Sequence, residues 1–166
     1  MQFYTRQECE DWLTRRERIR PDQDKSLLAE QFHYPREGYR FFPIANAIAQ
    51  SITYRQPTLL WVTEWGIWPS SENWQLYYKL RQSYGDFRLL QDVPGHLFLE
   101  YESEDFSTFL QVAMLSGWGG YVLTAANYVN AFFSHDEYIE FFTRTPAHLS
   151  ELRQYFAIPE NTGKSE

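Results

Sequence analysis

The segment 58–65 (TLLWVTEW) constrains the fold more than any other part of the chain. It combines aromatic and β-branched residues, which favour strands. Its first half is apolar at consecutive positions, whereas a strand with one solvated face alternates between apolar and polar residues. Such a run is typical of a central strand that is covered on both faces. We therefore predict a sheet with packed side chains on both sides and with Trp61 buried inside it.

Turn residues and apolar periodicity place the other elements around this strand. Thr5 and Glu8 have the spacing of a helix capping box, and so do Ser134 and Glu137. Helices are expected to open at Thr5, Asp22, Pro43, Pro69, Ser103, Ser134 and Thr145. Strands are expected at residues 38–42, 58–65, 96–101, 120–126 and 128–133, the last two as a hairpin.

These elements predict an α+β fold with a mixed, mostly antiparallel sheet of about five strands and helices packed on it. A chain of 166 residues with 43% hydrophobic and 22% charged residues is typical of one globular domain. We expect this domain to span residues 1–158. Residues 159–166 are polar and are expected to form a flexible C-terminal tail.

The number of cysteines and the length of the apolar segments indicate the cellular compartment in which the protein is expected. Cys9 is the only cysteine, which excludes an intrachain disulfide and a zinc site built from several cysteines. The first residues show no basic stretch followed by an apolar run, and no segment reaches the eighteen apolar residues of a membrane span. The sequence therefore predicts a cytoplasmic protein with no membrane partner.

The net charge of −7 is unevenly distributed along the chain. Residues 86–140 contain nine acidic residues and one basic residue, Arg88. Phosphate binding needs Lys and Arg, so an acidic surface of this kind disfavours a nucleic-acid partner. It attracts a protein with a basic surface instead. The alternative is a solvated acidic face that keeps the protein soluble.

Aromatic residues make up 19% of the chain, more than a core of this size requires. Most of them must belong to the core, but Tyr and Trp also recur in binding surfaces. A minority is therefore expected to form a recognition patch beside the acidic residues. The predicted partner-binding residues are Glu102, Glu104, Asp105, Trp68 and Trp74.

The sequence contains no glycine-rich phosphate loop, no HExxH and no GxSxG, so no known catalytic motif supports an enzyme. An enzymatic alternative therefore depends on three single residues. Glu64 lies inside the predicted central strand, and a buried carboxylate could serve as a general acid or base. It could equally pair with Arg40 or Arg55. His135 lies between Ser134 and Asp136, where helix capping is the competing explanation. The alternative function is a small hydrolase or other enzyme that uses Glu64, His96 and His135.

A metal site and a cofactor are not expected. His96 and Glu100 would share one face of a strand and could be two metal ligands, but the sequence offers no third one beside them. The acidic cluster at residues 100–105 lacks the ligand spacing and the internal glycine of a calcium loop.

Three segments carry a resemblance to known proteins: 59–86 (LLWVTEWGIWPSSENWQLYYKLRQSYGD), 94–100 (PGHLFLE) and 132–138 (FFSHDEY). They resemble a group of small bacterial proteins of unassigned function, over a stretch from the first helix to Phe142. The resemblance implies a bacterial cytoplasmic protein and brings no reaction or catalytic residue. In its small size, acidity and aromatic content the chain is also similar to toxin-neutralising immunity proteins. The predicted function is a non-enzymatic protein-binding module, such as an immunity or inhibitor protein against a basic toxin.

Overall fold

The computed structural model describes residues 1–33, 41–52, 55–65, 71–126 and 128–156. Within them the chain forms a seven-stranded sheet of order β1-β4-β3-β5-β6-β7-β2, in which every neighbouring pair is antiparallel. The strands are β1 (Gln2–Tyr4), β2 (Leu28–His33), β3 (Thr58–Glu64), β4 (Gly95–Phe98), β5 (Gly119–Thr124), β6 (Val129–Ser134) and β7 (Tyr138–Thr143). The predicted α+β class is confirmed. The prediction of a mixed sheet with about five strands is corrected to an antiparallel sheet with seven.

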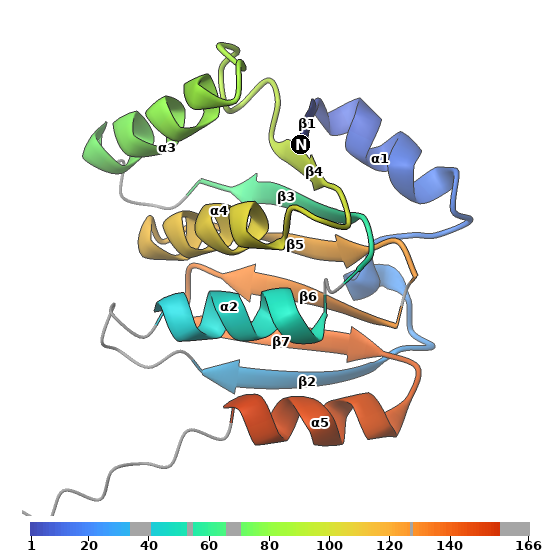
Figure 1. Ribbon diagram of the computed structural model, residues 1–166. Helices are drawn as coiled ribbons and strands as arrows, with labels where there is room; N and C mark the ends of the chain where they lie inside the picture. Colours follow the sequence, from blue (N-terminus) through green and yellow to red (C-terminus); the bar gives the residue numbers. More distant parts are fainter. Residues whose placement is uncertain (34–40, 53–54, 66–70, 127, 157–166) are drawn as a thin grey trace, which may run out of the picture.

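The helices in the described ranges lie on both faces of this sheet. They are α1 (Arg6–Thr14), α2 (Phe41–Ser51), α3 (Ser71–Ser83), α4 (Ser103–Leu115) and α5 (Pro146–Phe156), with a short 3-10 helix at Pro21–Gln23. Figure 1 shows α2 and α4 lying across one face, with α3 and α5 at opposite ends of the sheet. Helix α1 packs on the other face, where its side chains meet those of β3 and β5. None of these helices is long and apolar enough to span a membrane.

Strand β3 lies in the interior of the sheet, as its composition predicts. Leu60 and Val62 belong to the larger core cluster under α2 and α4, whereas Leu59 and Trp61 pack against α1 on the opposite face. The side chain of Trp61 is only 4% exposed. The prediction that Trp61 is buried in a strand covered on both sides is therefore confirmed.

Two helices also follow their sequence signals closely. At the start of α1, the Thr5 hydroxyl accepts a hydrogen bond from the Glu8 amide, and the Glu8 carboxylate accepts one from the Thr5 amide. These bonds satisfy two amides that a helix start leaves unpaired. In α4 the predicted apolar stripe is buried: Phe106, Phe109, Leu110, Ala113 and Met114.

Two segments near the N-terminus differ from the prediction. Residues 28–33 form strand β2 instead of the expected helix, because all six residues pair with β7. Phe32 then packs against Phe141 of β7 and Phe156 of α5, and these contacts outweigh the helical spacing of Leu28 and Phe32. The strand expected at 38–42 is also wrong in its described part, because Phe41 already begins α2; residues 38–40 lie outside the described residues.

The capping box expected at Ser134 and Glu137 is a hairpin turn between β6 and β7. Ser134 pairs with Tyr138 across the two strands, and the Ser134 hydroxyl accepts a hydrogen bond from the Asp136 amide at 3.1 Å. Glu137 has φ +63°, a left-handed conformation that serves the tight turn. Residues 138–143 therefore form β7 instead of a helix, because pairing with β6 and β2 satisfies their backbone groups.

Candidate functional site

The predicted acidic residues lie at the connection between β4 and α4, and Glu102 has a structural role there. Its carboxylate accepts a hydrogen bond from the Leu99 amide at 2.7 Å and pairs with the amino group of Met1. The side chain is only 14% exposed. Glu102 thus ties the start of the chain to the start of α4, and its carboxylate is used within the molecule.

Asp105 joins α4 to the end of α3 on the surface. The Tyr84 hydroxyl, just beyond the last residue of α3, donates a hydrogen bond to the Asp105 carboxylate. This bond, together with burial and the negative charge of Asp105, raises the pKa of Tyr84 to about 12. The Tyr84 ring also packs edge-on against Phe109, with 5.6 Å between the ring centroids. An exposed ring and a carboxylate are therefore held side by side in a fixed arrangement.

Further exposed rings lie on the segments that flank this pair. Phe87 is 74% exposed and Tyr101 is 80% exposed, and Glu104 on the first turn of α4 is exposed as well. We call Tyr84, Phe87, Tyr101, Glu104 and Asp105 the acidic aromatic face; Tyr84 and Asp105 are joined by a hydrogen bond, and the other three are grouped with them by exposure and by their place in the chain. The three rings were not among the predicted binding residues. Each lies in a mostly polar turn (residues 83–89, SYGDFRL, and 100–105, EYESED), and an aromatic residue in such a turn is a sequence signal for an exposed ring.

The two tryptophans predicted as anchors cannot be assigned to this face. Trp68 lies outside the described residues. Trp74 belongs to α3, but its side chain is also outside what the structure describes. Both remain predictions.

Glu64 and His135, two of the three residues of the enzymatic alternative, lie together at the ends of β3 and β6. Glu64 Oε2 is 2.9 Å from His135 Nδ1, and His135 Nε2 is 3.4 Å from Asp136 Oδ1. The register of β3 against β5 shifts between Val62 and Glu64, which places Glu64 opposite Gly119. A Cβ at Gly119 would lie 2.4 Å from Glu64 Oε2, so this position leaves no room for a side chain while Glu64 keeps its place. Of the partners considered for Glu64, Arg40 lies outside the described residues.

The Glu64 side chain also lines a cavity of about 580 Å³ between α1 and the sheet, whose apolar wall includes Trp61 and Tyr121. A carboxylate that accepts from Nδ1 orients an imidazole for proton transfer at Nε2. Here, however, Nε2 faces a second carboxylate. The nearby Ser134 hydroxyl is buried and accepts from the Asp136 amide.

His96, the third residue of the alternative, lies in a separate and fully buried place. Its ring contacts those of Phe3, Tyr77 and Phe109, with centroids 5.2–5.5 Å apart. Nε2 is 3.4 Å from the Tyr77 hydroxyl. Glu100, which would share a face with His96 in the predicted strand, lies beyond the end of β4 and is exposed. In the described part of the chain no three His, Cys, Asp or Glu side chains are grouped so that they could hold a metal ion.

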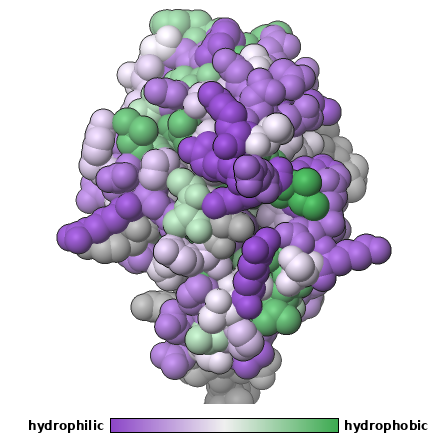
Figure 2. Space-filling model, turned by 90° about the vertical axis from the view of Figure 1, so that its right-hand side faces the viewer, coloured by the Kyte–Doolittle hydropathy of each residue, from purple (hydrophilic) through white to green (hydrophobic). Residues whose placement is uncertain are grey.

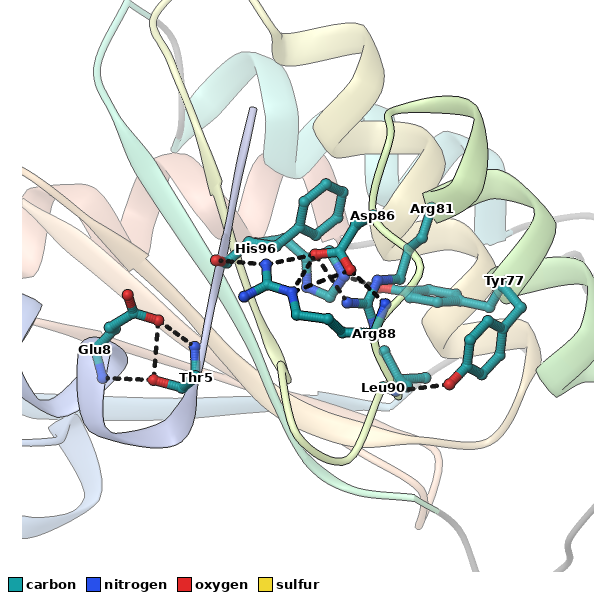
Figure 3. A network of polar contacts seen from close by, with 10 residues as sticks. Thr5, Glu8, Tyr77, Arg81, Asp86, Arg88, Leu90 and His96 are labelled. Carbon is teal, nitrogen blue, oxygen red and sulfur yellow. Dashed lines mark hydrogen bonds and ion pairs between the residues drawn. The ribbon is translucent and has the colours of Figure 1, made fainter.

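Near His96 lies a partly buried polar network, drawn in Figure 3, in which the buried Arg81 and the exposed Arg88 share the carboxylate of Asp86. Arg88 Nη2 is 2.6 Å from Asp86 Oδ2, and Arg81 Nη2 is 3.4 Å from the same oxygen. Burial raises the pKa of Asp86, but the hydrogen bonds from Arg88 and the charge of Arg81 outweigh it and hold the pKa below its usual value. Arg81 is completely buried, and its three guanidinium nitrogens make no hydrogen bond within the described residues.

We expect the burial of His96 to make the protein sensitive to mild acid. Burial, and then the charge of Arg81, lower the pKa of His96 from 6.5 to about 3. The unfolded chain therefore binds a proton below pH 6.5 that the folded protein does not bind, so stability is lost as the pH falls from 6.5 toward 3. Between pH 6.5 and 4.5 the free energy of unfolding is expected to fall by about 2–3 kcal/mol.

Urea unfolding at half-unit pH steps measures this loss, and NMR of the ring reports its protonation directly. The His96 ring is expected to stay neutral at pH 5 in the folded protein. A flat stability profile between pH 6.5 and 4.5, or a His96 ring protonated at pH 5, contradicts this expectation.

No protein-family model, curated protein or solved structure matches the chain. The resemblance to small bacterial proteins thus stays a prediction, and no activity, cofactor or partner can be inferred for this chain from a related protein. Function is inferred from its own residues: the acidic aromatic face and the Glu64–His135 pair.

Proposed function

We propose that this protein is a non-enzymatic binding protein that engages a basic protein through the acidic aromatic face. The observation that carries the proposal is the contact between Tyr84 and Asp105, which holds a ring and a carboxylate together on the surface. A Lys or Arg side chain of a partner can stack on such a ring and pair with the carboxylate at the same time.

The arrangement of the face suits binding for two further reasons. Tyr84 is held by Asp105 and Phe109, so little side-chain freedom is lost when a partner binds. The nine acidic residues and one basic residue in 86–140 make the long-range attraction favour a basic partner. An inhibitor or immunity protein that covers a basic toxin is the most concrete form of this function.

The experiment uses immobilised protein to capture partners from an extract of the source organism, followed by binding kinetics with the recovered protein. At low salt Glu104→Gln/Asp105→Asn is expected to slow association several-fold, and the difference should disappear at high salt because it depends on long-range charge. Tyr101→Ala is expected to speed dissociation about tenfold or more if this ring is a buried anchor in the complex.

The matched control is Glu10→Gln/Glu151→Gln, which removes the same charge from exposed positions outside both the face and residues 86–140. It is expected to leave association within twofold of the unmodified protein. An acidic recovered partner, or an unchanged association rate for Glu104→Gln/Asp105→Asn at low salt, overturns the proposal. Thermal unfolding of each variant separates lost binding from lost folding, since Glu104 and Asp105 also favour the start of α4.

A second candidate function is a small hydrolase that uses Glu64 and His135, and the 2.9 Å contact between them beside a cavity supports it. His96 would stay outside its reaction centre, because that ring is enclosed by other aromatic rings. Hydrolysis of p-nitrophenyl acetate that is lost in His135→Ala would favour this candidate over the binding protein.

A further inference from the structure

A second cavity, of about 380 Å³, lies where α2, the β5–β6 connection and α5 meet. Its apolar wall consists of Ile52, Val129 and Leu152, which are almost fully buried, and the exposed ring of Tyr128. These elements come together at the right-hand side of Figure 1, the side that faces the viewer in Figure 2. Hydrophobic residues appear there only in small groups among hydrophilic ones. The cavity combines an apolar wall with polar side chains around it.

One histidine, His148, lines this cavity, and its hydrogen bonds determine which ring nitrogen carries the proton. Thr143 Oγ1 donates its one hydrogen to the Tyr128 carbonyl at 2.7 Å and accepts from the Thr145 amide at 3.2 Å. It is also 3.0 Å from His148 Nδ1. A hydroxyl has one donor and two acceptor sites, so with its hydrogen on the Tyr128 carbonyl, the shorter of the two contacts, the remaining site accepts and Nδ1 is the donor.

The neutral ring therefore carries its hydrogen on Nδ1 and a lone pair on Nε2. Nε2 makes no hydrogen bond to another residue in the part of the chain that the structure describes. It is the ring nitrogen left for a molecule in the cavity. The Thr143 hydroxyl is buried, which fixes the ring against the end of β7 and keeps this acceptor in place.

The rest of the lining limits the charge of such a molecule. Arg55 and Glu151 contribute opposite charges, so the lining has no net charge. The Gln56 side chain donates to the Ile52 carbonyl at 2.6 Å and accepts from the Ala126 amide at 2.8 Å, which holds two sides of the rim together. A preformed site with an apolar wall and few oriented polar groups is typical of small-molecule binding.

We propose that this cavity binds a neutral small molecule of the phenol class, with an aromatic body and one hydroxyl. The hydroxyl donates to His148 Nε2, and the ring packs on Ile52, Val129, Leu152 and Tyr128. This site lies on other elements than the acidic aromatic face and does not depend on the proposed partner binding.

Phenol and anisole are the matched probes, because they share the ring and only phenol can donate a hydrogen bond. NMR titration of the full chain is expected to show saturable shifts for Tyr128, Val129 and His148 with phenol. Anisole should bind roughly threefold to tenfold more weakly, because it lacks the one hydrogen bond that phenol donates to His148. In His148→Phe, which keeps an aromatic ring but loses the acceptor, the two probes should bind equally.

Two controls keep the proposal testable if that variant is perturbed. His135→Phe, at the Glu64 pair, is expected to keep the preference for phenol. In the unmodified protein, the ring nitrogen shifts of the neutral His148 should show the hydrogen on Nδ1. The proposal is overturned by a hydrogen on Nε2, by the absence of saturable shifts at the cavity, or by a preference for phenol that survives in His148→Phe.

Discussion

Asp86→Asn is expected to lower the free energy of unfolding by about 3–5 kcal/mol, because it leaves the Arg81 guanidinium buried without a counter-ion. Asn keeps the size of the side chain and can still accept the hydrogen bond that the Arg88 amide gives to Asp86 Oδ1. The change therefore removes the charge of the carboxylate with little change in packing. Urea unfolding at pH 7 measures the difference.

A second substitution separates the charge effect from other causes. Arg81→Met in the Asp86→Asn background removes the uncompensated charge and is expected to recover most of the lost stability, since apolar replacements of buried ion pairs are often neutral or stabilising. Asp92→Asn, at an exposed acid in the same connection, should change stability by no more than about 0.5 kcal/mol. A loss under about 1 kcal/mol in Asp86→Asn would falsify the view that Asp86 neutralises Arg81.

Trp61→Ala is expected to lower the free energy of unfolding by about 3–5 kcal/mol, since it removes a buried ring from a packed core. The ring lies 6.3 Å from that of Tyr121 in the cluster that attaches α1 to the sheet. The substitution therefore also weakens the docking of α1, and hydrogen exchange in Arg6–Thr14 should become faster than in α4.

Tyr101→Ala is the control for Trp61→Ala, because it also deletes a ring but one that is mostly exposed. Its effect on stability should stay within about 0.5 kcal/mol. If Trp61→Ala unfolds at nearly the same urea concentration as the unmodified protein, the cluster under α1 contributes less than its burial indicates.

The elements that the sequence predicts well are those whose pattern is local and unambiguous. Strand β3 is apolar on both faces, and a strand of that kind is buried only in the interior of a sheet that is covered on both sides. Helices α1 and α4 both form with the apolar stripe expected of them. Thr5 caps α1 as predicted, whereas the cap expected from Ser103 is wrong, because Ser103 is the first residue of α4 and no side chain caps that helix. Charge likewise indicated the acidic segment near α4, although it could not show that Glu102 is bound to Met1.

The errors occurred where a local pattern fits two structures. Ser134 and Glu137 have the spacing of a helix cap, but the same Ser side chain can accept from an amide in a hairpin turn, as it does here. Leu28 and Phe32 are four residues apart, as on one face of a helix, and also an even number apart, as on one face of a strand. Residues 28–33 form a strand and not a helix because all six of them pair with β7.

The sequence by itself thus determined the α+β class, the interior position of β3, the cap of α1 and the apolar stripes of α1 and α4, because those depend on neighbours within a few residues. Only the tertiary structure decided the sheet order and the contacts between distant side chains. Glu64 and His135 are 71 residues apart in the chain, and Tyr84 and Asp105 are 21 apart. No spacing in the sequence encodes such pairs. The sheet order brings Glu64 and His135 together, and the packing of α3 against α4 brings Tyr84 and Asp105 together.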